Sequence, residues 1–256
     1  MLTASLFDQS GFSVRLGWGE RGAKEASLTE SLLIVCDVLR FSSAVVTAVH
    51  CGATVFPCPT YDDPAGAKSL ARQHNAILAV HSRDVPEKGR YSLSPQSFLT
   101  VLPGEKIVIE SLNGSICAAL GDKGATVYAG CFLNAKAVAK AAQKEAEESG
   151  KPIMVLACGE RSQLSDSEGE LRFALEDYLG AGAILSHFTL SLSPEAEVCA
   201  AAWRGSKARF KELLWDCGSG RELREKGLGA DVESVSQLDL YSVAPRLVQG
   251  EFADFS

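Results

Sequence analysis

The stretch that decides the fold is Leu32-Leu33-Ile34-Val35-Cys36-Asp37-Val38, followed by Leu39 and Arg40. Such a near-continuous run of apolar and β-branched residues is typical of a strand that is buried on both faces of a parallel sheet. Asp37 interrupts the run, although burying an unpaired carboxylate is costly. The stretch therefore predicts a central strand and marks Asp37 as a candidate functional residue.

Apolar runs and helical patterns alternate along the rest of the chain. Further strands are predicted over residues 13–16, 53–56, 76–80, 106–110, 125–128 and 152–157. Helices are predicted at 42–51, 63–74, from 115, at 134–149, 170–187 and 194–215, with shorter ones from 219 and within 231–237. The alternation predicts an α/β fold, a three-layer α/β/α arrangement around a mixed, largely parallel sheet. Because no Gly/Ser/Pro-rich linker divides the chain, residues 1–256 are predicted to form a single domain.

Composition excludes several classes of protein. The chain has 256 residues, 46% hydrophobic and 22% charged, which is ordinary for a globular protein. A net charge of −7 argues against a nucleic-acid or membrane-surface partner, since such proteins carry a basic face. No apolar run approaches the roughly 18 residues of a membrane span. The N-terminal residues lack the pattern of a secretory signal, so a cytoplasmic location is expected.

The cysteines are predicted to be reduced core residues. All eight lie in apolar stretches such as Leu156-Ala157-Cys158, where free Cys behaves as a small hydrophobe. The chain has no Cys-x-x-Cys pair, which argues against structural zinc. The four histidines have no metal-ligand spacing.

Polar residues that follow a buried strand are the natural site candidates, because ligands of α/β sheets gather beyond the carboxyl ends of the strands. Asp37 and Arg40 either form a buried structural ion pair or act as a cation ligand beside an anion clamp. Asn113-Gly114-Ser115 lies between a strand and a helix start, where free N–H groups can bind a phosphate. A plain capping turn remains the alternative there.

Two further patterns carry weaker signals. Glu176 and Asp177 fall outside the apolar stripe of their predicted helix, which makes a solvated helix face the simpler interpretation.

The segment from Gly17 to Gly22 fits the dinucleotide fingerprint, with Asp37 about 20 residues further on. However, residues 20–30 contain only Ala23, Ala26 and Leu28 as apolar residues, too few for a crossover helix. A dinucleotide-binding oxidoreductase is therefore a minor alternative.

Taken together, these segments resemble the 2-phosphosulfolactate phosphatase (ComB-like) family, over about residues 13–250. Several spaced motifs in the right order are more specific than any one of them. The segments that carry the resemblance are Val35–Ala48 with Gly52-Ala53, Asn113-Gly114-Ser115, the Gly130, Phe132 and Asn134 segment, Cys158-Gly159-Glu160, Glu176-Asp177 with Ala181-Gly182, and Asp231 and Pro245.

The resemblance implies a Mg²⁺-dependent phosphatase in the route to coenzyme M, whose substrate is the phosphate ester of a small sulfonated hydroxy acid. Phosphoryl transfer needs charge neutralisation and positioning more than covalent help. The resemblance leaves a homo-oligomer open. The resemblance implies five catalytic residues: Asp37, Arg40, Asn113, Glu176 and Asp177. It implies that Asp37 binds Mg²⁺ together with one or both of Glu176 and Asp177. The residues that it implies for binding phosphate or the substrate's acid groups are Arg40, Arg83, Asn113, Gly114 and Ser115.

The sequence departs from the family pattern in the regions that should set specificity. His81-Ser82-Arg83 replaces Gly-Glu-Arg, Leu93-Ser94-Pro95 replaces Asn-Ser-Pro, and Ser111-Leu112 replaces Thr-Thr. These departures leave open a related phosphorylated acid as the substrate. They also leave open a non-catalytic relative that binds small anions.

Overall fold

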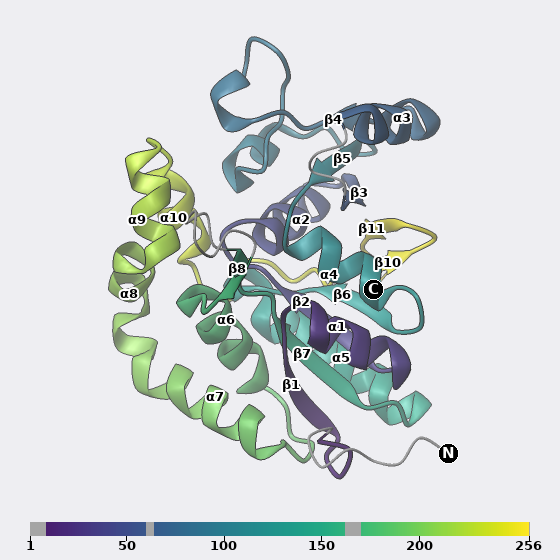
Figure 1. Cartoon of the computed structure of the whole chain (residues 1–256), viewed down its shortest axis with the longest axis vertical. Helices are drawn as coiled ribbons and strands as arrows, with labels where there is room; N and C mark the ends of the chain where they lie inside the picture. The colour runs from purple at the N-terminus through teal and green to yellow at the C-terminus, as the bar shows by residue number, and fades with distance from the viewer. Residues whose placement is uncertain (1–8, 60–63, 162–169, 256) are drawn as a thin grey trace.

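The computed structural model describes residues 9–59, 64–161 and 170–255 (Figure 1). A nine-stranded sheet runs through the molecule in the order β1-β7-β2-β6-β10-β11-β3-β5-β4. Its strands are β1 (Val14–Trp18), β2 (Leu32–Cys36), β3 (Thr54–Cys58), β4 (Ile77–Leu78), β5 (Lys106–Glu110), β6 (Thr126–Ala129), β7 (Ile153–Ala157), β10 (Arg246–Val248) and β11 (Glu251–Ala253).

The sheet contains two parallel groups of strands. In one group β1, β7, β2 and β6 pair in parallel, and in the other β3, β5 and β4 do so. The antiparallel hairpin β10–β11 joins the two groups. The predicted α/β class with a mixed, largely parallel sheet is therefore confirmed, whereas the hairpin has no counterpart in the prediction. Its turn is Gln249-Gly250, where both residues have the positive φ that a tight two-residue hairpin turn needs.

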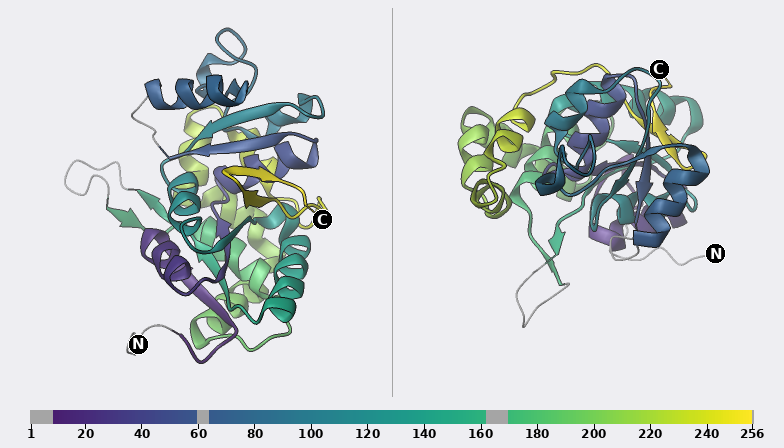
Figure 2. Two further views of the ribbon diagram at one scale, coloured as in Figure 1. Left: turned by 90° about the vertical axis from the view of Figure 1, so that its right-hand side faces the viewer. Right: turned by 90° about the horizontal axis from the view of Figure 1, so that it is seen from above.

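Helices cover the sheet in two groups (Figures 1 and 2). Helices α1 and α4 pack against each other on one group of strands, and α6 packs against both α5 and α7. Every residue of β2 and β7 is buried, as the apolar runs predict. The helices are α1 (Gly19–Leu28), α2 (Phe41–His50), α3 (Pro64–His74), α4 (Gly114–Gly121), α5 (Ala135–Ser149), α6 (Leu175–Leu185), α7 (Pro194–Ser206), α8 (Phe210–Asp216), α9 (Gly218–Glu225) and α10 (Gly229–Val235).

The prediction against a helix over residues 20–30 is wrong. Helix α1 occupies this segment and buries Gly19, Gly22, Ala23 and Ala26. A Cβ on Gly22 would lie 2.6 Å from a Leu156 methyl group and 3.0 Å from the Gly17 Cα. Small residues therefore let the helix approach the sheet closely, so large apolar residues are not needed.

Other boundaries also differ from the prediction. The helix predicted at 170–187 begins only at Leu175, because residues before it form a small hairpin of β8 (Glu160–Arg161) and β9 (Leu171–Arg172). The helix predicted at 194–215 is broken by a 3-10 turn at Lys207–Arg209. The helix predicted from Ser219 begins at Gly218, with Cys217 as its cap. Residue 63, the first of the helix predicted at 63–74, lies outside the described residues.

One large hydrophobic cluster fills the interior and includes residues from Val14 to Phe252. All eight cysteines are free, and all but Cys51 are buried, as predicted. None of the helices in the described part of the chain is long and apolar enough to cross a membrane.

Candidate active site

Asp37 lies directly after β2 and binds the first amides of two helices, α2 and α4. Its carboxylate accepts hydrogen bonds from the Phe41 amide at 3.2 Å and the Gly114 amide at 2.9 Å. The residue is only 5% exposed. Burial, followed by the nearby Glu160 carboxyl, raises the pKa of Asp37 to about 7, against the opposing effect of the two amides. Asp37 is therefore a carboxyl group that titrates near neutral pH.

Asp177, in the first turn of α6, connects two loops that follow neighbouring strands. It accepts hydrogen bonds from the Val38 amide at 2.8 Å and from the Gly159 amide at 2.9 Å. Asp177 is 3% exposed and Glu176 is 2% exposed, so the interpretation of this pair as a solvated helix face is wrong. Burial and the neighbouring Asp37 and Glu176 carboxyls raise the pKa of Asp177 well above its usual range.

Glu160 is not among the predicted site residues. It follows β7 and accepts hydrogen bonds from the Asn113 side chain at 2.7 Å and the Arg161 amide at 3.0 Å. Burial raises the pKa of Glu160, and the Asn113 hydrogen bond and the Arg172 charge oppose the rise. The signal that could have found it is its position directly after the Cys158-Gly159 turn at a strand's carboxyl end.

These acids form a single electrostatic cluster. Asp37 is repelled by Glu160 and Glu176, and Asp177 is repelled by all three of the other carboxyls. Such a cluster favours bound protons or a bound cation, because like charges in a buried site cannot all ionise without compensation. Within the described residues, however, no group of three His, Cys, Asp or Glu side chains is arranged to hold a metal ion.

The Asn113-Gly114-Ser115 turn joins β5 to α4 and is committed to internal contacts. The Gly114 amide, predicted to bind a phosphate, donates to Asp37, and Asn113 donates to Glu160. The Ser115 hydroxyl donates to the Cys58 and Ser111 carbonyl oxygens. A Cβ at Gly114 would lie 2.2 Å from the Phe41 ring and 2.8 Å from an Asp37 oxygen, so only glycine fits. The predicted binding roles of this turn stay predictions.

Arg40 forms a buried ion pair, but its partner is Asp231 rather than Asp37. Its Nη1 lies 2.8 Å from Asp231 Oδ2 and 3.2 Å from the Ser82 hydroxyl. The Arg40 and Asp231 side chains are 15% and 3% exposed. Arg83, in contrast, is exposed on a short 3-10 turn. Arg40 lines a cavity that Arg83 does not line, and the predicted roles of both residues stay predictions.

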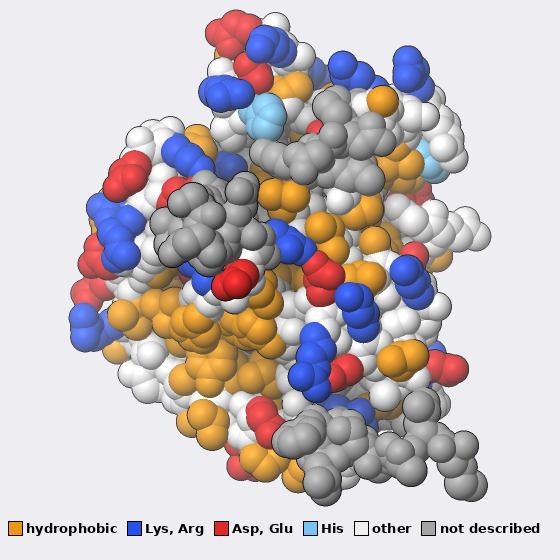
Figure 3. Space-filling model, in the orientation of Figure 1, with side chains coloured by type: hydrophobic (Ala, Val, Ile, Leu, Met, Phe, Trp, Pro, Cys, Tyr) orange, Lys and Arg blue, Asp and Glu red, His pale blue; other side chains and the backbone are white. Residues whose placement is uncertain are grey.

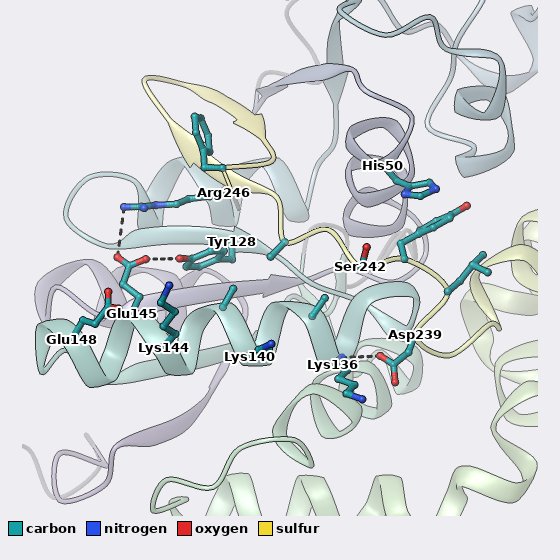
Figure 4. A pocket seen from close by; sticks show the side chains of 16 residues that line it. His50, Tyr128, Lys136, Lys140, Lys144, Glu145, Glu148, Asp239, Ser242 and Arg246 are labelled. Atoms are coloured by element: carbon teal, nitrogen blue, oxygen red, sulfur yellow. Dashed lines mark hydrogen bonds and ion pairs between the residues drawn. The ribbon is translucent and has the colours of Figure 1, made fainter.

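Two cavities flank the acids. One of about 360 Å³ is lined by Arg40, Ser82 and Lys68. The other, of about 430 Å³, is lined by Asn113 and Cys158. A larger groove of about 1040 Å³ lies elsewhere, between α5 and residues 239–246, and no predicted site residue lines it (Figure 4).

The surface beside the acids is apolar. Trp18 and Phe173 stack with ring centroids 5.4 Å apart, and Phe173 also contacts Tyr178. Phe173 is 58% exposed although it is a large hydrophobic residue. Figure 3 shows hydrophobic side chains gathered on this face of the molecule, around α6 and α7.

Loops at the carboxyl ends of β2, β5 and β7 thus bring Asp37, Asn113 and Glu160 together, and α6 adds Glu176 and Asp177. A buried, acid-rich site at this edge of a largely parallel sheet is typical of an α/β enzyme. A family model described as 2-phosphosulpholactate phosphatase matches residues 20–250. The chain belongs to this family, whose members are phosphoric monoester hydrolases, as the sequence predicts.

Similar proteins cover almost the same extent. A probable 2-phosphosulfolactate phosphatase from Pseudothermotoga lettingae is 27% identical over 226 residues, which are 87% of this chain and 92% of that protein. One from Carboxydothermus hydrogenoformans is 28% identical over 223 residues, 84% of this chain and 86% of that protein. One from Thermotoga maritima is 26% identical over 225 residues, 86% and 90% of the two chains. The family match over residues 20–250 includes every residue of the site described above.

Proposed function

We propose that this protein is a Mg²⁺-dependent phosphatase that hydrolyses the phosphate ester of a small acidic 2-hydroxy acid, 2-phosphosulfolactate or a close relative. The observation that carries the proposal is the cluster of the buried acids Asp37, Glu176 and Asp177 with the half-buried Glu160. A cluster of this kind is unfavourable in isolation and becomes favourable with a cation bound.

The donor set suits Mg²⁺, which prefers carboxylate oxygens. Asp37, Asp177 and Glu160 each accept two hydrogen bonds from protein N–H groups, which holds the carboxyls in place but leaves lone pairs on their oxygens. Mg²⁺ usually keeps several waters and takes one or two carboxylates, so a tight three-residue group is not required. When bound, the ion supplies positive charge that neutralises the phosphoryl oxygens.

The chain's own residues position the substrate and move a proton. Glu160 accepts a hydrogen bond from Asn113, which lines the second cavity, and its raised pKa suits a general base for the attacking water. The hydrogen bond from Asn113 fixes the orientation of the Glu160 carboxylate. Arg40 provides a guanidinium for an acidic group of the substrate.

Release of inorganic phosphate from a panel of 2-phospho-hydroxy acids, with Mg²⁺ and with a chelator, tests the proposal. We expect release that requires the metal ion and is lost in Asp37→Asn. Asp216→Asn is the matched control, because Asp216 is an exposed acid outside the site that pairs with Arg224. If no member of the panel is hydrolysed, the proposal fails and the non-catalytic alternative is favoured.

A further inference from the structure

The guanidinium of Arg40 is held in place through Nη1, whereas its Nε and Nη2 atoms can still donate hydrogen bonds to a ligand. Both hydrogen bonds of the side chain, to Asp231 and to Ser82, use Nη1. Nε and Nη2 have no hydrogen-bond partner within the described part of the chain. Neither atom is fully buried, so on a side chain that is only 15% exposed these N–H groups are open to a ligand, which would take the place of water as their hydrogen-bond partner.

The cavity of about 360 Å³ that Arg40 lines is the place for that ligand. Lys68, on α3, also lines it and forms no ion pair with the residues that the structure describes. Two acids face the same cavity: Asp84, which lies 2.8 Å from Lys88, and Glu110, at the end of β5. Arg40 connects this cavity to the acid cluster, because the next residue, Phe41, donates its amide hydrogen bond to Asp37.

Asp231 is itself fixed by contacts from a distant segment. The Ser94 hydroxyl donates to its second oxygen, Oδ1. The Gln96 side chain donates to the Ala230 carbonyl oxygen at 2.9 Å, which fastens the start of α10 to the same segment. Asp231 is 3% exposed and therefore faces Arg40 rather than solvent. Both oxygens of Asp231 are thus occupied, and its orientation is determined.

We propose that Asp231 is a positioning residue that aims the free Nε/Nη2 edge of Arg40 into this cavity, where the edge binds the acid group of the substrate that is not transferred. A guanidinium edge of this shape pairs with two oxygens of a carboxylate or sulfonate at once. Lys68 adds a second positive charge at the same subsite. The inference rests on the proposed phosphatase function, because it assigns the acid group of that substrate.

Two esters that differ only in the acid group provide the test: 2-phosphoglycolate and ethyl phosphate. In Asp231→Asn we expect KM for 2-phosphoglycolate to rise by about tenfold or more, since a charge-assisted pair is lost from its required orientation. The loss for ethyl phosphate should be much smaller, because this ester has no acid group for the Arg40 edge to bind. Glu212→Gln, which breaks the exposed Arg209–Glu212 pair, is the control and should change neither. An equal loss for both esters, or no loss for either, would overturn the proposal.

Two milder variants keep the inference testable if Asp231→Asn does not fold. Ser94→Ala removes one contact of Asp231, and Arg40→Lys keeps the charge but removes the planar edge. Both should weaken selectivity for 2-phosphoglycolate over ethyl phosphate, and unchanged selectivity in both would contradict the inference.

Binding separates this inference from the proposed function. If the wild-type protein releases no phosphate from any ester, the proposed function fails. Calorimetric binding of the two esters then decides the inference. Weaker binding of 2-phosphoglycolate alone in Asp231→Asn supports it, and unchanged binding overturns it.

Discussion

Replacing Asp37 by asparagine should flatten the dependence of the protein's stability on pH. In the folded protein the pKa of Asp37 is raised from 3.8 to about 7, chiefly by burial. Between these values the folded state holds a proton that the unfolded chain has released. The free energy of unfolding must therefore fall as pH rises through this window, by linkage.

The size of the effect follows from the shift. A pKa raised from 3.8 to about 7 corresponds to about 4 kcal/mol lost between pH 4 and pH 8 in the absence of divalent cations, at about 1.36 kcal/mol for each tenfold change in proton affinity. The asparagine side chain of the variant has no proton to lose, so the variant lacks this contribution. Its amide nitrogen cannot accept a hydrogen bond from the Phe41 or Gly114 amide, which costs about 1–3 kcal/mol at every pH.

Urea unfolding from pH 4.5 to 8.5 in a chelator measures both quantities. We predict that the free energy of unfolding falls with pH in the wild type and falls less steeply in Asp37→Asn, so that the two curves cross and the variant is the more stable protein at pH 8.5. Parallel curves would show that Asp37 does not titrate in this window, and the argument for a strained acid cluster would be refuted.

Three further outcomes follow from the same contacts. Gly114→Ala should lower the free energy of unfolding by about 1–3 kcal/mol in urea, since its Cβ would overlap the Phe41 ring; an unchanged midpoint would refute the packing argument. Glu160→Gln should keep the melting temperature but reduce phosphate release by about 10²–10⁴-fold, as expected for a lost general base; a fully active variant would exclude Glu160 from that role. Mg²⁺ at pH 8 should raise the melting temperature of the wild type, because an ion that binds only the folded state stabilises it; no shift would contradict metal binding.

Residue patterns predict the central strands well because burial on both faces produces a continuous apolar run. The run ending at Cys36 is the clearest case. Helix α1 escapes prediction because its packing depends on glycine and alanine at the interface, and a search for large apolar residues cannot detect that. The β10–β11 hairpin is not predicted because its strands have only three residues each, and because Gln-Gly is not among the usual hairpin turn sequences such as Asn-Gly or Asp-Gly.

The site is predictable where a polar residue follows a buried strand, as Asp37 does. The burial of Glu176 and Asp177 is harder to predict, because an apolar stripe predicts burial of one helix face only. In the structure, the loop after β2 and the start of α9 contact the other face of the first turn of α6 and bury both acids. The pairing of Arg40 with Asp231 joins residues 191 positions apart and has no local signal.

Calorimetric titration of Mg²⁺ into the wild-type protein at pH 7, in two buffers with different ionisation enthalpies, tests the acid cluster most directly. If the cluster is the metal site, the ion must displace protons from carboxyls whose pKa values are raised. We predict that Mg²⁺ binds with net proton release and that fewer protons are released in Asp37→Asn. No binding, or binding without proton release, would contradict it.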